Sequence, residues 1–166
     1  ESKTQELSLA NQTALTVTFS VGFEDVGPSD DPENPIVLLG EEVGEYSLAR
    51  YISSPQTSLT VRPGERVTIP ITVTIPHDAN PGGRYGAVLV ATDGGDAEED
   101  LSGARVISRI GSLFFVRVLG DVVESGHLED FRVSGPASLF LDSRPIEFEM
   151  LFSNEGNVHL TPYGIV

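Results

Sequence analysis

The sequence predicts an all-β protein with one complete β-sandwich, followed by the first strands of a second sandwich module. Apolar and polar residues alternate with a period of two along several short segments, which is the pattern of half-buried strands. Turn signals such as Pro63-Gly64 and Pro81-Gly82-Gly83 separate these segments. The chain has 166 residues, and a sandwich of about 100–120 residues buries a core without disulfides. These observations favour an immunoglobulin-like β-sandwich.

The clearest strand signals lie between residues 57 and 92. Segments 57–61 and 67–75 are predicted strands, and the second alternates valine and isoleucine with threonine. Segment 84–92 is apolar at nearly every position, which is typical of a central strand covered on both faces. Pro70 falls on the polar face of its strand. Because proline cannot donate to a ladder, we expect an edge or a bulge there.

The preceding residues contain a further amphipathic strand, predicted over 15–23 with one face in the core. Residues 24–35 are acidic and rich in proline, so we expect a solvent-exposed loop. A short edge strand is predicted at 36–39. Residues 41–52 fit either a strand or a short helical turn.

After residue 92 the sequence predicts a hairpin and then a change of module. An acidic tip at 93–100 leads into a long strand over 106–119, in which Gly111 marks a bend or bulge. The strands of the first sandwich extend from about residue 7 to about residue 122. We therefore assign residues 1–122 to the first domain and 123–166 to a partial second module.

The second module is predicted to contain strands at 128–133, 146–152 and 158–166, with a turn at 154–157. So few strands with one apolar face are not stable alone. The face therefore needs a partner surface: a continuing second sandwich, the first domain, or another copy. The continuing sandwich is favoured, because the given sequence stops within a predicted strand. The face that we predict to pair comprises Ile146, Phe148, Met150 and Phe152.

Charge excludes some classes of partner. The formal net charge is −15, with 25 acidic against 10 basic residues, and such a surface repels phosphate backbones and anionic lipids. No apolar run approaches the roughly 20 residues that span a bilayer, so direct membrane insertion is not expected. No signal-peptide pattern is present at Glu1, and we expect a mature piece of an exported precursor.

A calcium site is the one metal site that the sequence suggests. Five carboxylates fall within eight residues between strands, and calcium takes six to eight oxygen ligands. The spacing matches no EF-hand, and a solvated hairpin tip is the favoured alternative. No other cofactor is expected. The candidate ligands are Asp93, Asp96, Glu98 and Asp100, beside Glu99.

Enzyme motifs are missing from the sequence. There is no G-x-S-x-G pattern, and the three histidines are too far apart in sequence to indicate a zinc site. Glu147 and Glu149 are two carboxylates on one face, but it is the polar face of an amphipathic strand, with no tryptophan to stack on a sugar. The sequence therefore predicts a non-enzymatic protein.

Three smaller features each have a functional and an ordinary interpretation. Arg109 and Arg117 share a strand face unless a bulge intervenes, and either bind carboxylates of a ligand or, as we prefer, pair with nearby acids. Asn11-Gln-Thr13 is a formal glycosylation sequon, expected to be silent in a bacterium. Lys3 is the only lysine; it lies near an end expected to fray, which disfavours a lysine–asparagine crosslink.

Two motifs carry a family resemblance. They are Ser58-Leu-Thr-Val-Arg-Pro-Gly-Glu65, continuing into Ile75-Pro-His-Asp-Ala-Asn-Pro-Gly-Gly-Arg-Tyr-Gly-Ala-Val88, and Phe152-Ser-Asn-Glu-Gly-Asn-Val-His-Leu-Thr-Pro-Tyr-Gly164. The chain resembles the WxL-interacting proteins of Gram-positive cell surfaces. The resemblance implies a first domain that binds peptidoglycan and a second that binds a partner surface protein. It assigns no ligand-binding residue.

The resulting expectation is an extracellular, cell-surface module that docks a partner protein or cell-wall polymer at the bacterial envelope. Two alternatives stay open. One is a calcium-stabilised spacer or adhesin stalk. The other is a self-assembling filament or surface-layer subunit, a homo-oligomer that exchanges strands through 146–166.

Overall fold

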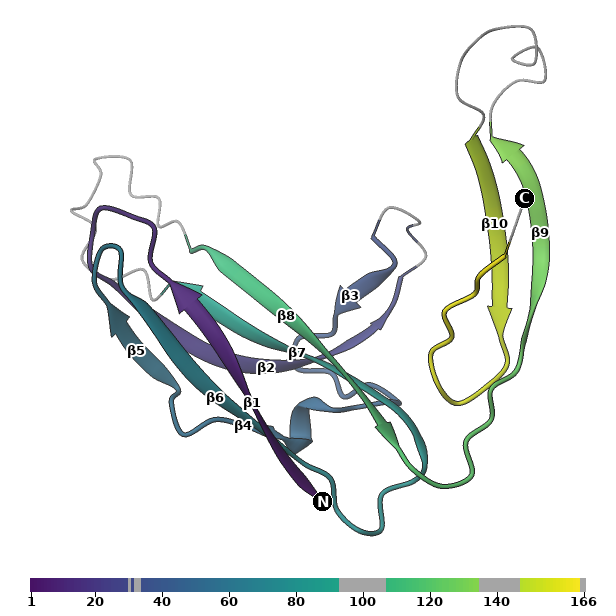
Figure 1. Cartoon of the computed structure of the whole chain (residues 1–166), viewed down its shortest axis with the longest axis horizontal. Coiled ribbons are helices and arrows are strands. Elements are labelled where there is room, and N and C mark those ends of the chain that lie inside the picture. The colour runs from purple at the N-terminus through teal and green to yellow at the C-terminus, as the bar shows by residue number, and fades with distance from the viewer. Residues whose placement is uncertain (30, 32–33, 93–106, 135–146, 165–166) are drawn as a thin grey trace, which may run out of the picture. The chain divides into compact units, whose positions relative to one another are not determined.

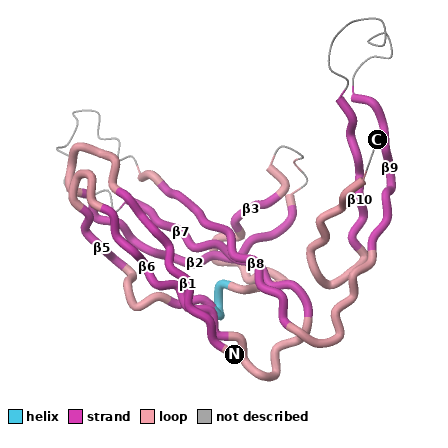
Figure 2. Tube along the Cα trace, viewed as in Figure 1, coloured by secondary structure: helices cyan, strands magenta, loops and turns pink. Residues whose placement is uncertain are grey.

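The computed structural model describes residues 1–29, 31, 34–92, 107–134 and 147–164. They form two compact units. The first comprises residues 1–79 and 84–118, and the second comprises residues 80–83 and 119–166. The described residues of both units are built from antiparallel strands (Figure 1, Figure 2). The described part of the chain contains no helix with the length and hydrophobicity needed to cross a membrane.

The first unit is an immunoglobulin-like β-sandwich, as predicted. One sheet has the order β1 (Ser2–Ala10), β6 (Arg66–Thr74) and β4 (Ile52–Ser53). The other has the order β3 (Ile36–Leu38), β2 (Val17–Pro28), β7 (Gly82–Thr92) and β8 (Arg109–Val118), with β5 (Ser58–Val61) also paired to β2. Strands far apart in sequence are neighbours, so the sheets depend on long-range pairing.

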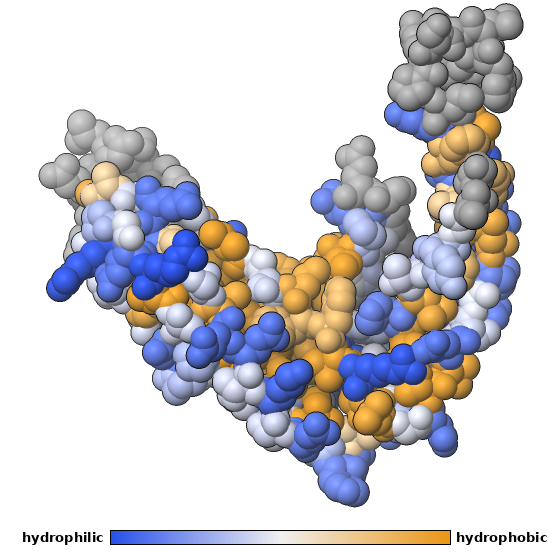
Figure 3. Space-filling view, in the orientation of Figure 1, coloured by the Kyte–Doolittle hydropathy of each residue, from blue (hydrophilic) through white to orange (hydrophobic). Residues whose placement is uncertain are grey.

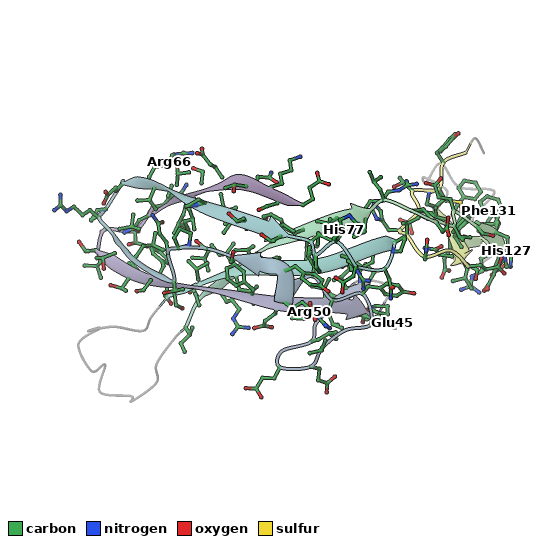
Figure 4. All side chains as sticks on the ribbon, turned by 90° about the horizontal axis from the view of Figure 1, so that it is seen from below. Glu45, Arg50, Arg66, His77, His127 and Phe131 are labelled. Atoms are coloured by element: carbon green, nitrogen blue, oxygen red, sulfur yellow. The ribbon has the colours of Figure 1, made fainter. Side chains whose placement is uncertain are left out.

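The core lies between these two sheets, whose layers are seen edge-on in Figure 4. Its members come from the alternating apolar positions that the sequence indicated, together with Leu48 from the segment before the 3₁₀ turn η1 (Ala49–Tyr51). Burying each large side chain contributes about 1.5–3 kcal/mol. The buried core comprises Phe19, Val21, Leu48, Ile52, Val61, Ile69, Ile71, Val88 and Val90.

Several strand predictions are confirmed. The segment 84–92 is covered on both faces, with Ala87 and Val88 fully buried. The short strand at 36–39 is an edge strand, since β3 ends the sheet order. Strand β4 pairs with β6 at Val73 and Thr72. On that side of β6, Pro70 faces no paired strand among the described residues, so it lies at an open edge. The register of β6 with β1 runs through Pro70 without a bulge.

Three boundary predictions are wrong. The segment 24–35 is not a loop throughout, because β2 continues to Pro28. Leu15 lies before β2 and is 72% exposed. Lys3 does not lie in a frayed end, because β1 begins at Ser2 and pairs with β6, and Thr4 and Thr72 share a hydroxyl hydrogen bond of 2.9 Å.

The described strands of the second unit form a hairpin of β9 (Gly126–Ser134) and β10 (Glu147–Asn154). The predicted strand at 158–166 is not formed over 158–164, where no strand is assigned. Val158 is nevertheless buried, and its backbone carbonyl accepts a hydrogen bond in the turn described below.

Candidate interaction surfaces

The predicted calcium ligands Asp93, Asp96, Glu98 and Asp100 lie outside the described residues. Within the described residues, no group of three or more His, Cys, Asp or Glu side chains is arranged to hold a metal ion. The calcium hypothesis therefore stays a prediction from sequence.

Asp25, from the other acidic segment, has a structural role. It is 4% exposed, and its carboxylate accepts hydrogen bonds from the backbone N–H groups of Ala49 (2.8 Å), Leu48 (3.0 Å) and Gly44 (3.1 Å). Burial raises the pKa of Asp25, but the Ser47 hydroxyl and these three amides outweigh burial and hold the pKa below its usual value. Asp25 thus fastens the turn at 44–49 to β2.

That turn places Tyr46 beside β7. The Tyr85 N–H donates to the Tyr46 carbonyl (2.9 Å), and the Leu48 N–H donates to the Tyr85 carbonyl (3.2 Å). The rings of Tyr46 and Tyr85 meet edge to face with centroids 6.1 Å apart, and Tyr85 meets Phe115 of β8 in the same way at 5.5 Å. Such contacts fix ring orientation beyond simple burial.

These rings lie on the outer face of the five-stranded sheet, away from the main core. We call Tyr46, Tyr85, Leu113 and Phe115 the aromatic face. Tyr85 packs on a small cluster made of Val26, Ala87 and Leu89, whereas the alternate β8 residues, Phe114 and Val116, pack on the main core. Tyr46 is 40% exposed, Leu113 48% and Phe115 49%. Apolar side chains gather over β8 and its neighbouring strands in Figure 3.

Sequence reasoning missed the aromatic face. The largely apolar sequence of β7 indicated that both of its faces are covered, but not that one face carries a surface with exposed aromatic rings. The period-two pattern of β8, in which Leu113 and Phe115 alternate with Phe114 and Val116, was the available signal.

The arginines beside this face differ in their contacts. Arg109 Nη1 lies 3.0 Å from Glu24 Oε1, so pairing with a nearby acid, the preferred interpretation, is confirmed for Arg109. Arg84 Nη1 donates to the Glu45 carbonyl (3.3 Å), on the turn that Asp25 holds. Figure 4 labels Glu45, in the turn at 44–49, and Arg50, in η1.

The second unit presents its own apolar face. Phe148 pairs with Val133 and Met150 with Phe131, and directly paired residues share a face of a sheet. The Phe131 and Phe148 rings are stacked with centroids 5.5 Å apart. A bulge leaves Glu129 without a partner in the ladder and brings Phe152 opposite Leu128. We call Leu128, Phe131, Val133, Phe148, Met150 and Phe152 the hairpin face.

The structure thus places three of the four residues predicted to pair, and Ile146 lies outside the described residues. Met150 is 63% exposed and Phe148 47%. Phe152 is half-buried, with its ring over Gly126. Glu149 lies on the opposite, polar face, where it accepts two hydrogen bonds of 2.9 Å from Arg132. This pairing lowers the pKa of Glu149 and raises that of Arg132.

The same asparagine turn occurs in both units. Asn11 Nδ2 donates to the carbonyl of Leu15 (2.7 Å), and Asn11 Oδ1 accepts from the Thr13 N–H (3.0 Å). Asn154 repeats both bonds: its Nδ2 donates to the carbonyl of Val158 (2.8 Å), and its Oδ1 accepts from the Gly156 N–H (3.0 Å). Each turn follows the last residues of a strand, β1 or β10.

Asn157 explains the second sequence motif. Its Oδ1 accepts from the Val123 N–H (2.8 Å), its Nδ2 donates to the Asp121 carbonyl (3.2 Å), and its own carbonyl accepts from the Gly83 N–H (2.7 Å). One side chain and one peptide group therefore join three segments of the second unit, so the motif has a structural role.

The histidines occupy ordinary positions. His77 lies in the turn after β6, and His127 lies on β9, not in a linker, with its Nδ1 3.5 Å from Glu155 Oε1 (Figure 4). His159 lies in an irregular segment, not in the predicted strand. Among the described residues, none of these histidines belongs to a group of three or more His, Cys, Asp or Glu side chains that could hold a metal ion.

Fold and surfaces together define an all-β sandwich protein with two exposed apolar faces. No protein-family model matches the sequence, and no curated protein matches it. Among solved structures, the chain is similar to an ASH/PapD-like domain of human CEP192 (PapD-like domain 7), with 12% sequence identity and a TM-score of 0.45. The match covers 72% of this chain and 73% of that one.

Proposed function

We propose that this chain is a non-enzymatic docking module of the bacterial cell surface, which binds a partner protein through its aromatic face. The envelope location rests on the motif resemblance described above. The docking role rests on the aromatic face.

The observation that carries the proposal is the exposure of apolar and aromatic side chains in one cluster. Tyr46, Leu113 and Phe115 are each at least 40% exposed. The edge-to-face contacts through Tyr85 hold the rings in place. Clustered exposed apolar residues mark interaction sites, and tyrosine and phenylalanine are enriched at protein interfaces. Rings already held in one orientation lose little entropy on binding.

A protein partner fits this surface better than a glycan does. The three rings meet edge to face, with interplanar angles of 65° and 82° for the two contacts. They therefore form no flat platform on which a row of sugar rings stacks. Aliphatic Leu113 beside Phe115 adds a contact suited to apolar side chains.

Site-specific photo-crosslinking tests the proposal. A benzoylphenylalanine at position 115 is compared with one at Thr68, which is exposed on the outer face of the β1-β6-β4 sheet. Both variants are produced in cells of the source organism and irradiated. We expect a discrete protein adduct from position 115 and none from position 68.

Two results would overturn the proposal. The first is equal labelling from both positions, which means nonspecific contact. The second is an adduct at position 115 that stays with the insoluble wall in detergent and is released by a muramidase, which indicates binding of wall polymer instead.

A further inference from the structure

We propose that the partner protein adds an extended segment to the outer edge of β8, as a further strand of the five-stranded sheet. The inference rests on the proposed function and states how the partner is held. It commits to one occupant: a segment of another protein in the β conformation, neutral or basic, with large apolar side chains at alternate positions.

The contacts between β7 and β8 determine which backbone groups of β8 point to this edge. The Thr92 N–H donates to the Ser108 carbonyl (2.9 Å), and the Leu89 side chain lies against Gly111. Both contacts fit one antiparallel register. Because Ser108 bonds to β7 and bonded positions alternate along a ladder, the backbone groups of Gly111 and Leu113 point away from β7. Among the described residues no strand lies on that side, since β8 ends the sheet order.

The aromatic contact supports this register. Tyr85 of β7 lies opposite Phe115 of β8, with their rings in contact. The Tyr85 N–H and carbonyl bond to Tyr46 (2.9 Å) and Leu48 (3.2 Å), on the turn at 44–49. They are therefore directed away from β8, as expected for a pair that is not hydrogen-bonded in an antiparallel ladder.

Among the described strands at sheet edges, β8 lacks the features that discourage further pairing. Such features are shortness, charged side chains and proline. Strands β4, β3 and β5 have two, three and four residues. Strand β1 carries Lys3 and Glu6, and β9 and β10 both carry charged residues. Strand β8 has ten residues, and its positions 110–116 contain no charged residue and no proline.

The side chains of β8 resemble those of an inner strand that is left incompletely covered. Phe114 and Val116 pack on the main core, but Ile110, on the same face by alternation, is 66% exposed. Leu113 is exposed on the opposite, aromatic face. An added strand would cover both faces at once, because its own side chains alternate in the same way. Uncharged segments of high β-propensity pair readily when their edge is exposed.

The chemistry of the edge selects the occupant. Its row of N–H and carbonyl groups is matched by an extended peptide, and alternate side chains of that peptide supply specificity. A second copy of this chain is disfavoured, because two chains that each carry a formal net charge of −15 repel one another. A neutral or basic segment of another protein meets no such repulsion.

Proline at position 111 tests the pairing. Gly111→Pro removes an N–H that points to the outer edge and takes no part in the ladder with β7, and proline is tolerated at such positions. Gly111→Ala is the matched control. It adds a Cβ that meets only the end of the Leu89 side chain (3.1 Å), and it keeps the N–H. Circular dichroism and thermal melting verify that both variants fold.

Both variants carry benzoylphenylalanine at position 115 and are irradiated in cells of the source organism. We expect the yield of the partner adduct to fall about tenfold in Gly111→Pro, because a hydrogen bond is lost and the proline ring obstructs the incoming strand. The yield in Gly111→Ala should equal that of the chain with Gly111 intact.

Hydrogen exchange of the unsubstituted chain tests the edge even if Gly111→Pro does not fold. In the absence of a partner, the amides of Gly111 and Leu113 should exchange faster than those of Ser112 and Phe114, which face β7. Equal protection of all four amides would overturn the assignment of the outer edge.

Three crosslinking results would also overturn the inference. An undiminished adduct in Gly111→Pro means that the partner docks on the aromatic face without adding a strand, and the docking function then stands. An adduct with the mass of two copies of this chain makes a second copy the occupant. The absence of any adduct from the chain with Gly111 intact removes the docking function itself.

Discussion

The Asp25 carboxylate and the Ala49 backbone are joined by a hydrogen bond of 2.8 Å that links β2 to the start of η1. Asp25 also receives the N–H groups of Leu48 and Gly44. Leu48 is fully buried in the core, and Tyr46, two residues earlier, belongs to the aromatic face. One carboxylate therefore positions a core residue and a surface residue together.

Replacing Asp25 by alanine is expected to lower the free energy of unfolding by about 3 kcal/mol or more. Three backbone donors lose their acceptor, and a buried unsatisfied donor costs about 1–3 kcal/mol. Urea unfolding at neutral pH measures the loss. Glu24→Ala is the control, because Glu24 contacts the exposed Arg109 and a surface ion pair contributes about 0–1 kcal/mol. Similar losses in both variants would contradict the assigned role of Asp25.

Asp25 also predicts a pH dependence of stability. Its folded pKa is below the ordinary value of 3.8, so the folded protein holds this proton less tightly than the unfolded chain does. The stabilisation is therefore complete above the unfolded pKa and is lost as the pH falls through the folded pKa. The stability difference between wild type and Asp25→Asn should be constant above about pH 5 and shrink below about pH 4. A difference that grows on acidification would show the opposite shift.

Asn11→Ala should destabilise the first unit by about 2–3 kcal/mol. Asn11 is 2% exposed, and its amide also donates to the Val61 carbonyl at 2.9 Å, so the substitution opens a buried turn. Asn34→Ala is the matched control: Asn34 is exposed and donates to Asp31 at 2.8 Å, and we expect a change within about 0.5 kcal/mol. Thermal melting of both variants makes the comparison, and equal midpoints would refute the prediction.

Gly156→Ala should open the turn of the second unit. A Cβ added there overlaps the Val123 carbonyl oxygen, so the backbone must move. Hydrogen exchange should rise in β9 and β10 and stay unchanged in β6. At Gly22 an added Cβ meets no atom within 4 Å, so Gly22→Ala should leave exchange unchanged throughout. Unaltered protection of the hairpin in Gly156→Ala would mean that this turn does not hold the second unit.

The positions of strands could be predicted from the sequence wherever one face of a strand is buried. Residues 67–75 and 84–92 were predicted within two residues of β6 and β7, because branched side chains at alternate positions leave one register that buries them all. The partners of these strands were not predictable. Strand β1 is largely polar and exposed. It forms because it pairs with β6, whose residues lie 56 (Ala10 to Arg66) to 72 (Ser2 to Thr74) positions further along the chain.

The surfaces were predictable only in part. The apolar positions of β10 were visible in its alternation, but the aromatic face depends on Tyr46, which belongs to no strand. Its place is set by Asp25, an acidic residue in a segment that composition indicated to be solvent-exposed. Burial of a carboxylate follows from three converging amides, and that convergence exists only in the folded chain.

The bonding of Asn11 bears on the choice of expression host. Its side chain uses both amide hydrogens and is buried, yet Asn11-Gln-Thr13 is a formal acceptor sequence. A eukaryotic secretory host modifies nascent chains before they fold, and a glycan on Nδ2 removes one of those hydrogens and cannot fit in the closed turn. Glycosylation and folding therefore compete for the same nitrogen atom. The misfolded fraction of material from such a host would rise with the fraction of chains that carry a glycan on Asn11, whereas a bacterial host avoids the conflict.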